Sequence, residues 1–472
     1  MRKTKIIATI GPASDNEETM RKLALAGMDC ARFNFSHDAH SDHARKINLL
    51  KKIREELGIP IATLLDTKGP EIRIGDFENG SVYLKKGDTF TFVSEPTLGT
   101  QEKVSTTLPT LYENLKAGDT ILIDDGKLSM EVLEIRGTDI VCTVLNEGKI
   151  SNHKGINLPG IEINMPYVSE TDRSDIIFGC GQKVDFMALS FVRCADDVRQ
   201  VRQILSENGG SKIRLIAKIE NMQGVRNLSE ILDVSDGIMV ARGDMGVEIP
   251  FTKLPSIQKQ IIELCNKEGK LVITATQMLD SMISNPRPTR AEISDVANAV
   301  YDGSTAIMLS GETAAGQYPE ESLRTMAAIA EEAERHKEYI QDSPVSIKDW
   351  NFSENTRRTI ILASCTAAKY QQASAMVVAT HTGHSARILS SVRPDSPIIA
   401  MTDDPSVMYQ LNLEWNIKPF LMETMDNAED LIDACIEKTA HLPFIKKGDS
   451  LVILGNSRIA SVTEFMKLNI VE

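Results

Sequence analysis

The sequence lacks the features that mark secreted, membrane-bound or disordered proteins. Its seven cysteines are scattered and none forms a C-x-x-C pair, which argues against a disulfide framework and indicates reduced thiols in a cytoplasmic protein. No run of about 18 apolar residues occurs, so we expect no membrane span, and the apolar run after the basic start is too short for a signal peptide. Low-complexity segments are also absent.

Acidic side chains outnumber basic ones, which narrows the possible partners. The chain has 66 Asp and Glu against 52 Lys and Arg, a formal net charge of -14 at pH 7. Such a surface argues against non-specific binding to nucleic acid or to an anionic membrane. It does not exclude an anionic substrate, because a cleft can carry the opposite charge. The 472 residues, 42% hydrophobic and 25% charged, indicate a soluble globular chain of about two to four domains.

Short runs rich in valine and isoleucine alternate with longer amphipathic segments. They predict strands at residues 5–10, 29–35, 61–65, 184–191, 213–219, 237–241, 271–275 and 305–309. Helical patterns, such as those at 195–207 and 254–267, lie between them. Parallel strands with crossover helices in this number predict a (β/α)8 TIM barrel. The alternative is one long doubly wound sheet that continues past residue 340, but a break after the last of these strands favours the barrel.

The pattern changes twice, which predicts further domains. Between about residues 75 and 166, alternating stretches broken by Gly-Asp and Asp-Gly turns indicate a small antiparallel β domain. A polar stretch at 338–354 precedes a smaller α/β alternation, with helices expected at 356–370 and 385–391 and strands at 375–379, 397–401, 418–422 and 450–454. We therefore expect an α/β protein with a barrel at 1–70 and 169–343, an inserted β-barrel lid domain at 71–168 and a C-terminal α/β regulatory domain at 344–472.

Polar residues, most of them ionisable, and one glycine collect where the expected barrel strands end. They are Arg32, Asn34, Ser36, His37, Asp66, Thr67, Lys218, Glu220, Gly243 with Asp244, and Thr276. Buried strands rarely carry so many ionisable groups. Because active sites of such barrels lie at the carboxyl ends of the strands, we expect these residues to converge.

The residue types suit transfer of a phosphoryl group between two anions, a reaction in which the protein mainly positions and neutralises. Glu220 and Asp244 can hold Mg²⁺ (or Mn²⁺) together with substrate oxygens. Lys218 and Arg32 can neutralise phosphoryl oxygens. A further cluster offers oxygen ligands for a monovalent cation: Asn34, Ser36, Asp66 and Thr67.

Taken alone, each of these side chains has an ordinary structural explanation. Lys218 and Glu220 can form a salt bridge inside a barrel. Asp66 can cap a helix, as can Thr289 further along the chain, and His37 can simply face solvent. The coincidence at successive strand ends favours the functional interpretation.

A series of motifs follows in order along the chain: KIIATIGP (5–12), RFNFSH (32–37), LDTKGPEIR (65–73), KGINLPG (154–160), IRLIAKIENMQGV (213–225), MVARGDMGVEIP (239–250), TATQMLDSM (274–282), NPRPTRAEISD (285–295) and MLSGET (308–313). Together they resemble the pyruvate kinase family, and residues 213–225 are similar to the signature around its active-site lysine. The resemblance spans about residues 1–340 and continues more weakly into the last domain. It implies a Mg²⁺- and K⁺-dependent enzyme that moves the phosphoryl group of phosphoenolpyruvate onto ADP, giving pyruvate and ATP in the last step of glycolysis.

The resemblance also implies roles for single residues. Lys218 would stabilise the transition state, Arg32 would contact the substrate phosphate, and Gly243 and Thr276 would hold the substrate carboxylate, with Thr276 near the proton-delivery path. Glu220 and Asp244 would bind Mg²⁺. The K⁺ ligands would be Asn34, Ser36, Asp66 and Thr67. The nucleotide would contact His37, Arg73 and Lys154. In this family a glutamate at the position of Glu71 accompanies K⁺ dependence, whereas a lysine there replaces the ion.

The last domain resembles the part of the family that binds a phosphorylated allosteric effector. The residues concerned are Thr380, Thr382, Gly383, His384, Ser385 and Arg387, which follow an expected strand and open a helix, where backbone amides favour a phosphate. Residues 454–463 depart from the family, because they lack the Gly-rich Thr-Asn loop expected to close over a sugar bisphosphate. A monophosphorylated sugar remains a candidate effector. The resemblance further implies a homotetramer and a lid that closes over ADP about hinges at 69–70 and 159–160.

Two other functions fit part of the sequence. Another metal-dependent barrel acting on pyruvate or phosphoenolpyruvate, such as an aldolase or a mutase, would share the acidic pair and an anion-binding arginine, but would need no lid carrying Lys154. A sensor that binds a phosphorylated metabolite through its last domain would leave the barrel silent. The set of Lys218, Glu220, Asp244 and Thr276 argues against that sensor.

Overall fold

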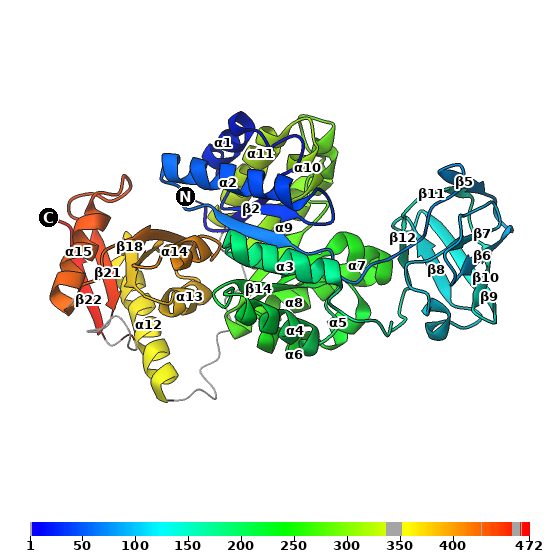
Figure 1. The fold of residues 1–472 in the computed structure, drawn as a ribbon. Helices are drawn as coiled ribbons and strands as arrows, with labels where there is room; N and C mark the ends of the chain where they lie inside the picture. Colours follow the sequence, from blue (N-terminus) through cyan, green and yellow to red (C-terminus); the bar gives the residue numbers. More distant parts are fainter. Residues whose placement is uncertain (1, 337–351, 426, 456–462, 464) are drawn as a thin grey trace.

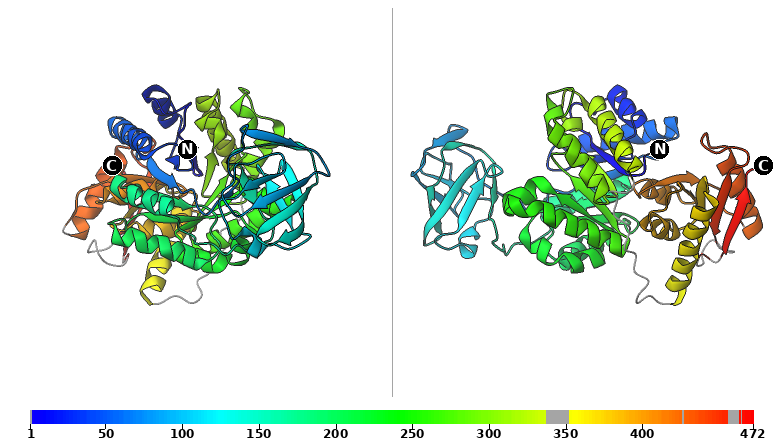
Figure 2. Two further views of the ribbon diagram at one scale, coloured as in Figure 1. Left: turned by 45° about the vertical axis from the view of Figure 1, so that its right-hand side comes forward. Right: turned by 180° about the vertical axis from the view of Figure 1, so that it is seen from behind.

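The computed structural model describes residues 2–336, 352–425, 427–455, 463 and 465–472. The chain forms an elongated molecule with three parts in a row (Figure 1). The barrel lies in the middle, the lid at one end and the C-terminal domain at the other, and the view from behind shows the same order (Figure 2).

Eight parallel strands close into a barrel in the order β1-β17-β16-β15-β14-β13-β3-β2. They are β1 (Lys5–Thr9), β2 (Cys30–Asn34), β3 (Ala62–Asp66), β13 (Phe186–Leu189), β14 (Arg214–Ile219), β15 (Gly237–Ala241), β16 (Leu271–Ala275) and β17 (Ala306–Leu309). The predicted TIM barrel is confirmed. The single doubly wound sheet is wrong, because β1 pairs with both β2 and β17 and so closes the ring.

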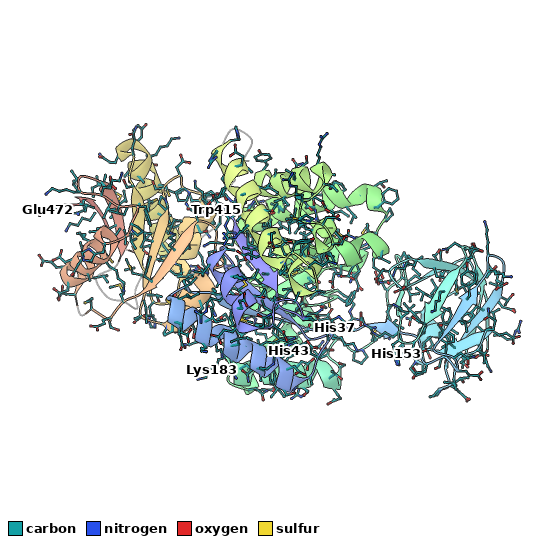
Figure 3. All side chains as sticks on the ribbon, turned by 90° about the horizontal axis from the view of Figure 1, so that it is seen from above. His37, His43, His153, Lys183, Trp415 and Glu472 are labelled. Carbon is teal, nitrogen blue, oxygen red and sulfur yellow. The ribbon has the colours of Figure 1, made fainter. Side chains whose placement is uncertain are left out.

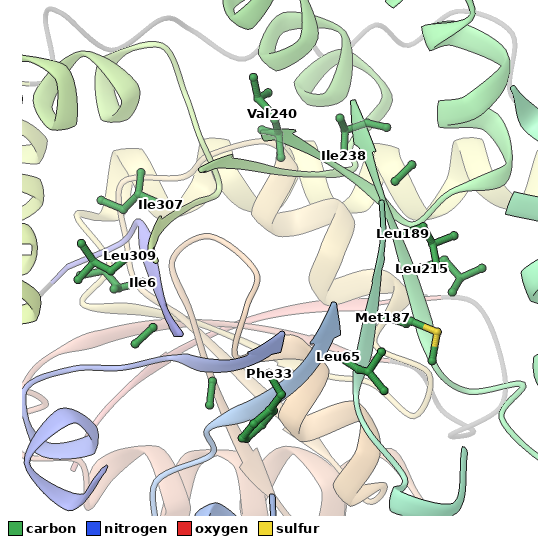
Figure 4. Close-up of a cluster of buried hydrophobic side chains, with 14 of the residues drawn as sticks. Ile6, Phe33, Leu65, Met187, Leu189, Leu215, Ile238, Val240, Ile307 and Leu309 are labelled. Carbon is green, nitrogen blue, oxygen red and sulfur yellow. The ribbon is translucent and has the colours of Figure 1, made fainter. Parts of the chain in front are cut away.

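Helices surround the barrel and bury the outward side chains of its strands. The longer ones are α1 (Glu17–Leu25), α2 (His40–Leu57), α3 (Glu170–Gln182), α4 (Ala195–Glu207), α8 (Leu254–Glu268), α9 (Arg290–Tyr301) and α11 (Pro319–Arg335), and short helices α5 (Met222–Arg226), α6 (Leu228–Val234), α7 (Arg242–Glu248) and α10 (Gly311–Ala314) fill the loops. Ile6, Phe33, Leu215 and Ile238 contribute to this outer core (Figure 4). Alternate residues point inward, so that Ile7 and Met239 belong to a second core inside the barrel.

The lid is inserted between β3 and β13 and has its own hydrophobic core. Its main sheet has the order β4-β12-β8-β9-β10-β6-β7, and β5 pairs with β11. The strands are β4 (Ile72–Arg73), β5 (Ser81–Leu84), β6 (Thr89–Val93), β7 (Lys103–Ser105), β8 (Thr120–Ile123), β9 (Leu128–Arg136), β10 (Asp139–Val144), β11 (Gly148–Ser151) and β12 (Gly155–Asn157). Phe90 and Phe92 lie in that core, separate from the barrel cores. The pairing is mainly antiparallel, as the turn pattern predicts.

The C-terminal domain is a sheet with an apolar core on each face. The sheet has the order β20-β19-β18-β21-β22. Its elements are α12 (Phe352–Gln371), β18 (Ala375–Ala379), α13 (His384–Ser391), β19 (Ile398–Thr402), α14 (Pro405–Leu411), β20 (Ile417–Leu421), α15 (Ala428–Ala440), β21 (Ser450–Gly455) and β22 (Phe465–Ile470). Strand β22 runs antiparallel along the edge and was not predicted. Most of the polar stretch expected to separate this domain from the barrel lies outside the described residues.

The C-terminal domain packs against the amino-terminal end of the barrel. Leu413 joins the core inside the barrel, and Lys5 Nζ donates a hydrogen bond to the Ile417 carbonyl at 2.7 Å. The Arg54 guanidinium lies 3.4 Å from the centroid of the Tyr409 ring. Seen from above, Trp415 lies at this junction, while His37 and His153 lie near the junction of barrel and lid (Figure 3). The carboxyl ends of the strands therefore face the lid.

Candidate active site

Lys218 stands at the carboxyl end of β14 and is almost completely buried. Its Nζ donates to Ser190 Oγ at 2.7 Å and lies 3.2 Å from Asp66 Oδ1 and 3.0 Å from Glu220 Oε1. Burial alone lowers the pKa of a lysine, but the surrounding carboxylates outweigh it and hold the pKa of Lys218 above its usual value. The ammonium is therefore charged at neutral pH, as a group that neutralises a phosphoryl oxygen must be.

Asp66 is shared between two cationic side chains. Arg32 Nε donates to Asp66 Oδ2 at 2.6 Å, while Lys218 approaches Oδ1. Burial raises the pKa of Asp66, yet the charges of Arg32 and Lys218 prevail and leave that pKa below its usual value. Asp66 is the last residue of β3, so it does not cap a helix. It instead holds Arg32 and Lys218 beside one another.

One carboxylate oxygen of Glu220 accepts a hydrogen bond and the other does not. Oε2 accepts a hydrogen bond from the Phe191 amide at 2.6 Å, whereas the buried Oε1 lies near Lys218 without a hydrogen bond of good geometry. Burial raises the pKa of Glu220 to about 8, and the charge of Asp244 adds to this effect while Lys218 opposes it. A buried carboxylate oxygen without a hydrogen bond is suited to bind a cation.

Mg²⁺ fits the acidic pair of Glu220 and Asp244. The ion is commonly held by one or two carboxylates, with substrate and water oxygens completing an octahedron. Within the described residues, no three or more His, Cys, Asp and Glu side chains gather into a larger metal-binding group. The donor set on the protein is therefore a pair of hard oxygen ligands, which leaves positions for a substrate.

The residues predicted for K⁺ lie at the adjoining ends of β2 and β3. The strand register places Asn34 opposite Asp66. Asn34 Oδ1 accepts a hydrogen bond from the Ser36 amide at 3.2 Å, and Thr67 Oγ1 accepts one from the Ser190 amide at 3.2 Å. The donor set contains only oxygen atoms, which suits a hard cation.

Ser190 links these groups, although it was not predicted. Its hydroxyl donates to the Thr67 carbonyl at 2.6 Å and accepts from Lys218, and it is only 2% exposed. Asp66 Oδ1 lies 3.2 Å from the same hydroxyl. The expected strand at 184–191 ran through Ser190, whereas β13 ends at Leu189. No sequence signal distinguished this serine from an ordinary strand residue.

Thr276 and Gly243 meet where β15 and β16 end. Thr276 Oγ1 accepts a hydrogen bond from the Gly243 amide at 2.8 Å and donates to the Ala275 carbonyl at 2.6 Å. Thr276 has φ = 69°, a left-handed conformation that is costly for a β-branched residue and that clusters at functional sites. Gly243 and Asp244 belong to α7 rather than to the strand. Both donors are engaged with protein acceptors, so a carboxylate would accept a hydrogen bond here only in exchange for one of these two.

The three residues predicted for the nucleotide do not join the Lys218 cluster. Arg73 donates to Glu71 Oε2 at 2.8 Å and to the His153 carbonyl at 2.7 Å. Lys154 Nζ pairs with Asp124 Oδ1 at 2.9 Å, and His37 is exposed just beyond β2. Arg73 and Lys154 thus approach from the lid and His37 from the barrel.

A cavity lies between the lid and the barrel. It is lined by residues of both parts, including Glu71, Asp125, Arg193, Asn221, Asp244 and Glu248. Asn157 Nδ2 of the lid donates to Glu248 Oε1 of the barrel at 2.9 Å. At the expected hinge, Gly69 has φ = 72°, and a Cβ there would lie 2.8 Å from the Ser190 carbonyl oxygen, so only glycine fits. The cavity thus has Asp244 of the barrel and Glu71 of the lid on its wall.

The residues predicted for the effector lie at the far end of the molecule, between β18 and α13. Gly383 has φ = 78°, and its amide donates to Thr380 Oγ1 at 3.1 Å. The hydroxyls of Ser385 and Thr463 are hydrogen-bonded at 2.7 Å. Arg387 Nη1 donates to the Thr382 carbonyl of this loop at 2.9 Å, while Arg387 Nε lies 3.4 Å from Glu414 Oε1. Residues 456–462, within the divergent stretch, lie outside the described residues.

Other expectations concern the remainder of the chain. All seven cysteines are free, as their scattered spacing predicts. Thr289 caps α9 with a reciprocal pair of hydrogen bonds to Glu292, which confirms its structural explanation. In the parts of the chain that the structure describes, no helix is long and apolar enough to cross a membrane.

Comparisons with known proteins cover almost the whole chain. The family described as "Pyruvate kinase, barrel domain" matches residues 1–323, and "Pyruvate kinase, alpha/beta domain" matches residues 358–468. The pyruvate kinase of Clostridium acetobutylicum is 47% identical over 475 residues, covering 100% of both chains. That of Geobacillus stearothermophilus is 43% identical, covering 100% of this chain and 80% of the other. A crystal structure of a pyruvate kinase from Cryptosporidium parvum superposes with a TM-score of 0.92 at 38% identity, covering 100% of this chain and 96% of the other.

Proposed function

Because this chain belongs to the pyruvate kinase family, we propose that it transfers the phosphoryl group of phosphoenolpyruvate to ADP, giving pyruvate and ATP in the last step of glycolysis. The observation that carries the proposal is the contact of Lys218 with Asp66 and Glu220 at the carboxyl end of the barrel, with Arg32 beside them. The two reactants are both anions and repel one another. Fixed positive charge in a buried site reduces that repulsion far more than it would in water.

Lys218 and Arg32 act on the phosphoryl group. Their nitrogen atoms neutralise its oxygens while the bond from phosphorus to the enol oxygen breaks and the bond to the terminal phosphate oxygen of ADP forms. The enolate left behind takes up a proton at C3 to give pyruvate. Gly243 and Thr276 hold the substrate carboxylate, and the Thr276 hydroxyl stands near the path of that proton.

Two kinds of metal ion complete the proposal. Glu220 and Asp244 would hold Mg²⁺ (or Mn²⁺), which supplies charge neutralisation and orientation for the phosphoryl oxygens. The K⁺ site comprises Asn34, Ser36, Asp66 and Thr67. Glu71 is the residue whose family counterpart accompanies K⁺ dependence.

The lid and the C-terminal domain have separate tasks. His37, Arg73 and Lys154 contact ADP or ATP, and the lid closes over the nucleotide about the hinges at 69–70 and 159–160. A phosphorylated sugar bound at Thr380, Thr382, Gly383, His384, Ser385 and Arg387 regulates the enzyme. We further propose that the protein is a cytoplasmic homotetramer. Each subunit then comprises the barrel (residues 1–70 and 169–343), the lid (71–168) and the C-terminal domain (344–472).

A spectrophotometric assay of pyruvate formation from phosphoenolpyruvate and ADP tests the function. We expect activity that requires Mg²⁺ or Mn²⁺ and rises with K⁺. Absence of ADP-dependent pyruvate would reject the proposal, and equal rates with and without K⁺ would reject the potassium site alone. The same assay separates the two rivals, because an aldolase or mutase does not depend on ADP and a sensor forms no product.

A further inference from the structure

Ser190 follows β13 at the carboxyl end of the barrel, and its side chain is held from two sides. Its hydroxyl group carries a single proton, which the Thr67 carbonyl accepts at 2.6 Å. The lone pairs that remain accept the hydrogen bond from Lys218 Nζ at 2.7 Å. The contact with Thr67 thus fixes the direction of the hydroxyl group, which acts on Lys218 only as an acceptor.

Lys218 needs a fixed acceptor because two carboxylates attract its ammonium group. Asp66 Oδ1 lies 3.2 Å from Nζ and Glu220 Oε1 lies 3.0 Å from it, at the ends of different strands. A lysine side chain is a compact charge on a flexible stem, so attraction alone does not determine where the charge rests. A hydrogen bond from a charged donor is directional and stronger than a neutral one. The bond to Ser190 therefore determines the position of the ammonium group between the two carboxylates.

The main chain of Ser190 contacts both segments that join the lid to the barrel. In the first segment, Gly69 packs so closely that a Cβ there would lie 2.8 Å from the Ser190 carbonyl oxygen. In the second segment, the Tyr167 hydroxyl donates a hydrogen bond to the same carbonyl at 2.9 Å. Burial raises the pKa of the Tyr167 phenol, so the phenol keeps its proton at neutral pH and remains a donor.

The residues that follow in this loop are attached in the same two directions. The Phe191 amide donates to Glu220 Oε2 at 2.6 Å. Arg193 Nη1 donates to the carbonyls of Ile163 and Met165, at 3.2 and 3.0 Å, in the segment that returns from the lid. The loop after β13 therefore contacts the Lys218 cluster on one side and the connections to the lid on the other.

We propose that Ser190 is a positioning residue for the phosphoryl transfer: its hydroxyl holds the Lys218 ammonium toward the phosphoryl group, and its carbonyl ties that position to the lid. The inference rests on the proposed function, because the place of Lys218 matters for the rate only if Lys218 stabilises the transferred group. Movement of the lid displaces the Tyr167 hydroxyl and with it the acceptor of Lys218. Ser190 acts through Lys218 and not on the substrate itself.

Steady-state kinetics of a double-mutant cycle tests the proposal. Ser190→Ala should lower kcat about 10- to 100-fold, the loss of one hydrogen bond to a charged group, and leave the KM for ADP within about twofold. In the Lys218→Met background the same substitution should change kcat by less than about twofold, because no ammonium group is left to position. Tyr167→Phe should lower kcat about 2- to 10-fold, the loss of one neutral hydrogen bond, and this loss should also disappear in that background.

Ser304→Ala is the matched control. Ser304 is completely buried and its hydroxyl is hydrogen-bonded to Thr274 Oγ1 at 2.7 Å, but it precedes β17 at the opposite end of the barrel. Its kcat should stay within about twofold of the wild-type value. Circular dichroism and urea denaturation establish that each variant is folded. If Ser190→Ala does not fold, the cycle of Tyr167→Phe with Lys218→Met decides.

Wild-type kcat in Ser190→Ala would overturn the proposal. So would a loss of equal size with and without Lys218, because a general effect on the fold does not depend on that ammonium group. An equal loss in Ser304→Ala would have the same meaning, and unchanged kcat in Tyr167→Phe would remove the tie to the lid. Absence of ADP-dependent pyruvate in the wild type would instead reject the proposed reaction, so the two failures are distinguishable.

Discussion

The two ends of the barrel both bury charged side chains, but they use them differently. At the end toward the C-terminal domain, buried cations pair with fixed groups of the protein. Lys5 donates to the Ile417 carbonyl, and Arg54 pairs with Asp185 at 3.5 Å. At the end toward the lid, Lys218 and Glu220 lie within 3.0 Å of one another, yet Glu220 Oε1 has no proper hydrogen bond.

This difference distinguishes charged residues that stabilise the fold from charged residues that act in catalysis. Burial of an ion pair is weak evidence for function, because structural networks also bury charge and shift pKa values. At the lid end the unsatisfied atom is a carboxylate oxygen suited to a metal ion, and the same end has a strained Thr276 and a cavity that reaches Asp244. At the other end the unsatisfied nitrogen atoms of Arg2 and Arg54 belong to guanidinium groups that are otherwise hydrogen-bonded to the protein. We therefore expect substitutions at one end to change catalysis and comparable substitutions at the other to change stability.

Replacement of the two buried lysines gives the largest contrast. Lys218→Met should lower kcat by at least ~10²–10³-fold, the usual loss for one electrostatic stabiliser. Lys5→Met should leave kcat within about threefold while it costs ~1–3 kcal/mol of stability, because a buried carbonyl loses its partner. Steady-state kinetics and urea denaturation of both variants measure these effects. Near-normal turnover of Lys218→Met would remove Lys218 from the mechanism.

Truncation of Leu413 tests the structural end of the barrel. Leu413→Ala should cost ~2–5 kcal/mol in the free energy of unfolding, because it opens a cavity inside the barrel that cannot collapse. The control Leu468→Ala removes a side chain on the exposed edge strand and should cost no more than ~0.5 kcal/mol. Equal denaturation midpoints for the two variants would show that Leu413 does not seal the barrel.

Glu71→Lys addresses the monovalent cation. We expect the wild-type rate to fall at least ~10-fold without K⁺, about 1.4 kcal/mol of transition-state stabilisation. Glu71→Lys should retain most of its rate without K⁺, because the lysine ammonium supplies the missing charge. Glu71→Gln, which adds no cation, should remain K⁺-dependent. Equal K⁺ dependence of the lysine and glutamine variants would contradict the role of Glu71.

The smallest effect concerns the lid. Asn157→Ala removes the hydrogen bond to Glu248 and should raise the KM for ADP several-fold, since such a bond contributes ~0.5–1.5 kcal/mol. Asn146→Ala is the control, because Asn146 bonds to Lys127 within the lid. Small-angle scattering should show a more compact wild-type molecule with nucleotide than without. Identical scattering curves would contradict lid closure.

Much of the fold could be predicted because the barrel strands are buried on both sides and read as continuous apolar runs. The predicted strand boundaries were less accurate, because an apolar run can extend beyond the end of a strand. Phe191, for example, has φ = 56° and lies beyond β13. Strand β22 was missed because most of its side chains are exposed and form no apolar run. The position of Leu413 inside the barrel depends on domain packing, which no local pattern contains.

The sequence predicted those residues of the candidate site that lie at the carboxyl ends of the barrel strands. Because parallel strands end at one rim, Arg32, Asp66, Lys218 and Glu220 were expected together, and they lie together. Ser190 could not be found, because its role arises from contacts between β3, β13 and β14. Nor could the sequence show that Arg387, which donates to the Thr382 carbonyl of the effector loop, also reaches Glu414.

An experimental structure with phosphoenolpyruvate and Mn²⁺ tests the central claim most directly. The account predicts the phosphate within hydrogen-bonding reach of Lys218 and Arg32, and the anomalous signal of manganese beside Glu220 and Asp244. Substrate bound away from that rim, or manganese held by other side chains, would contradict it.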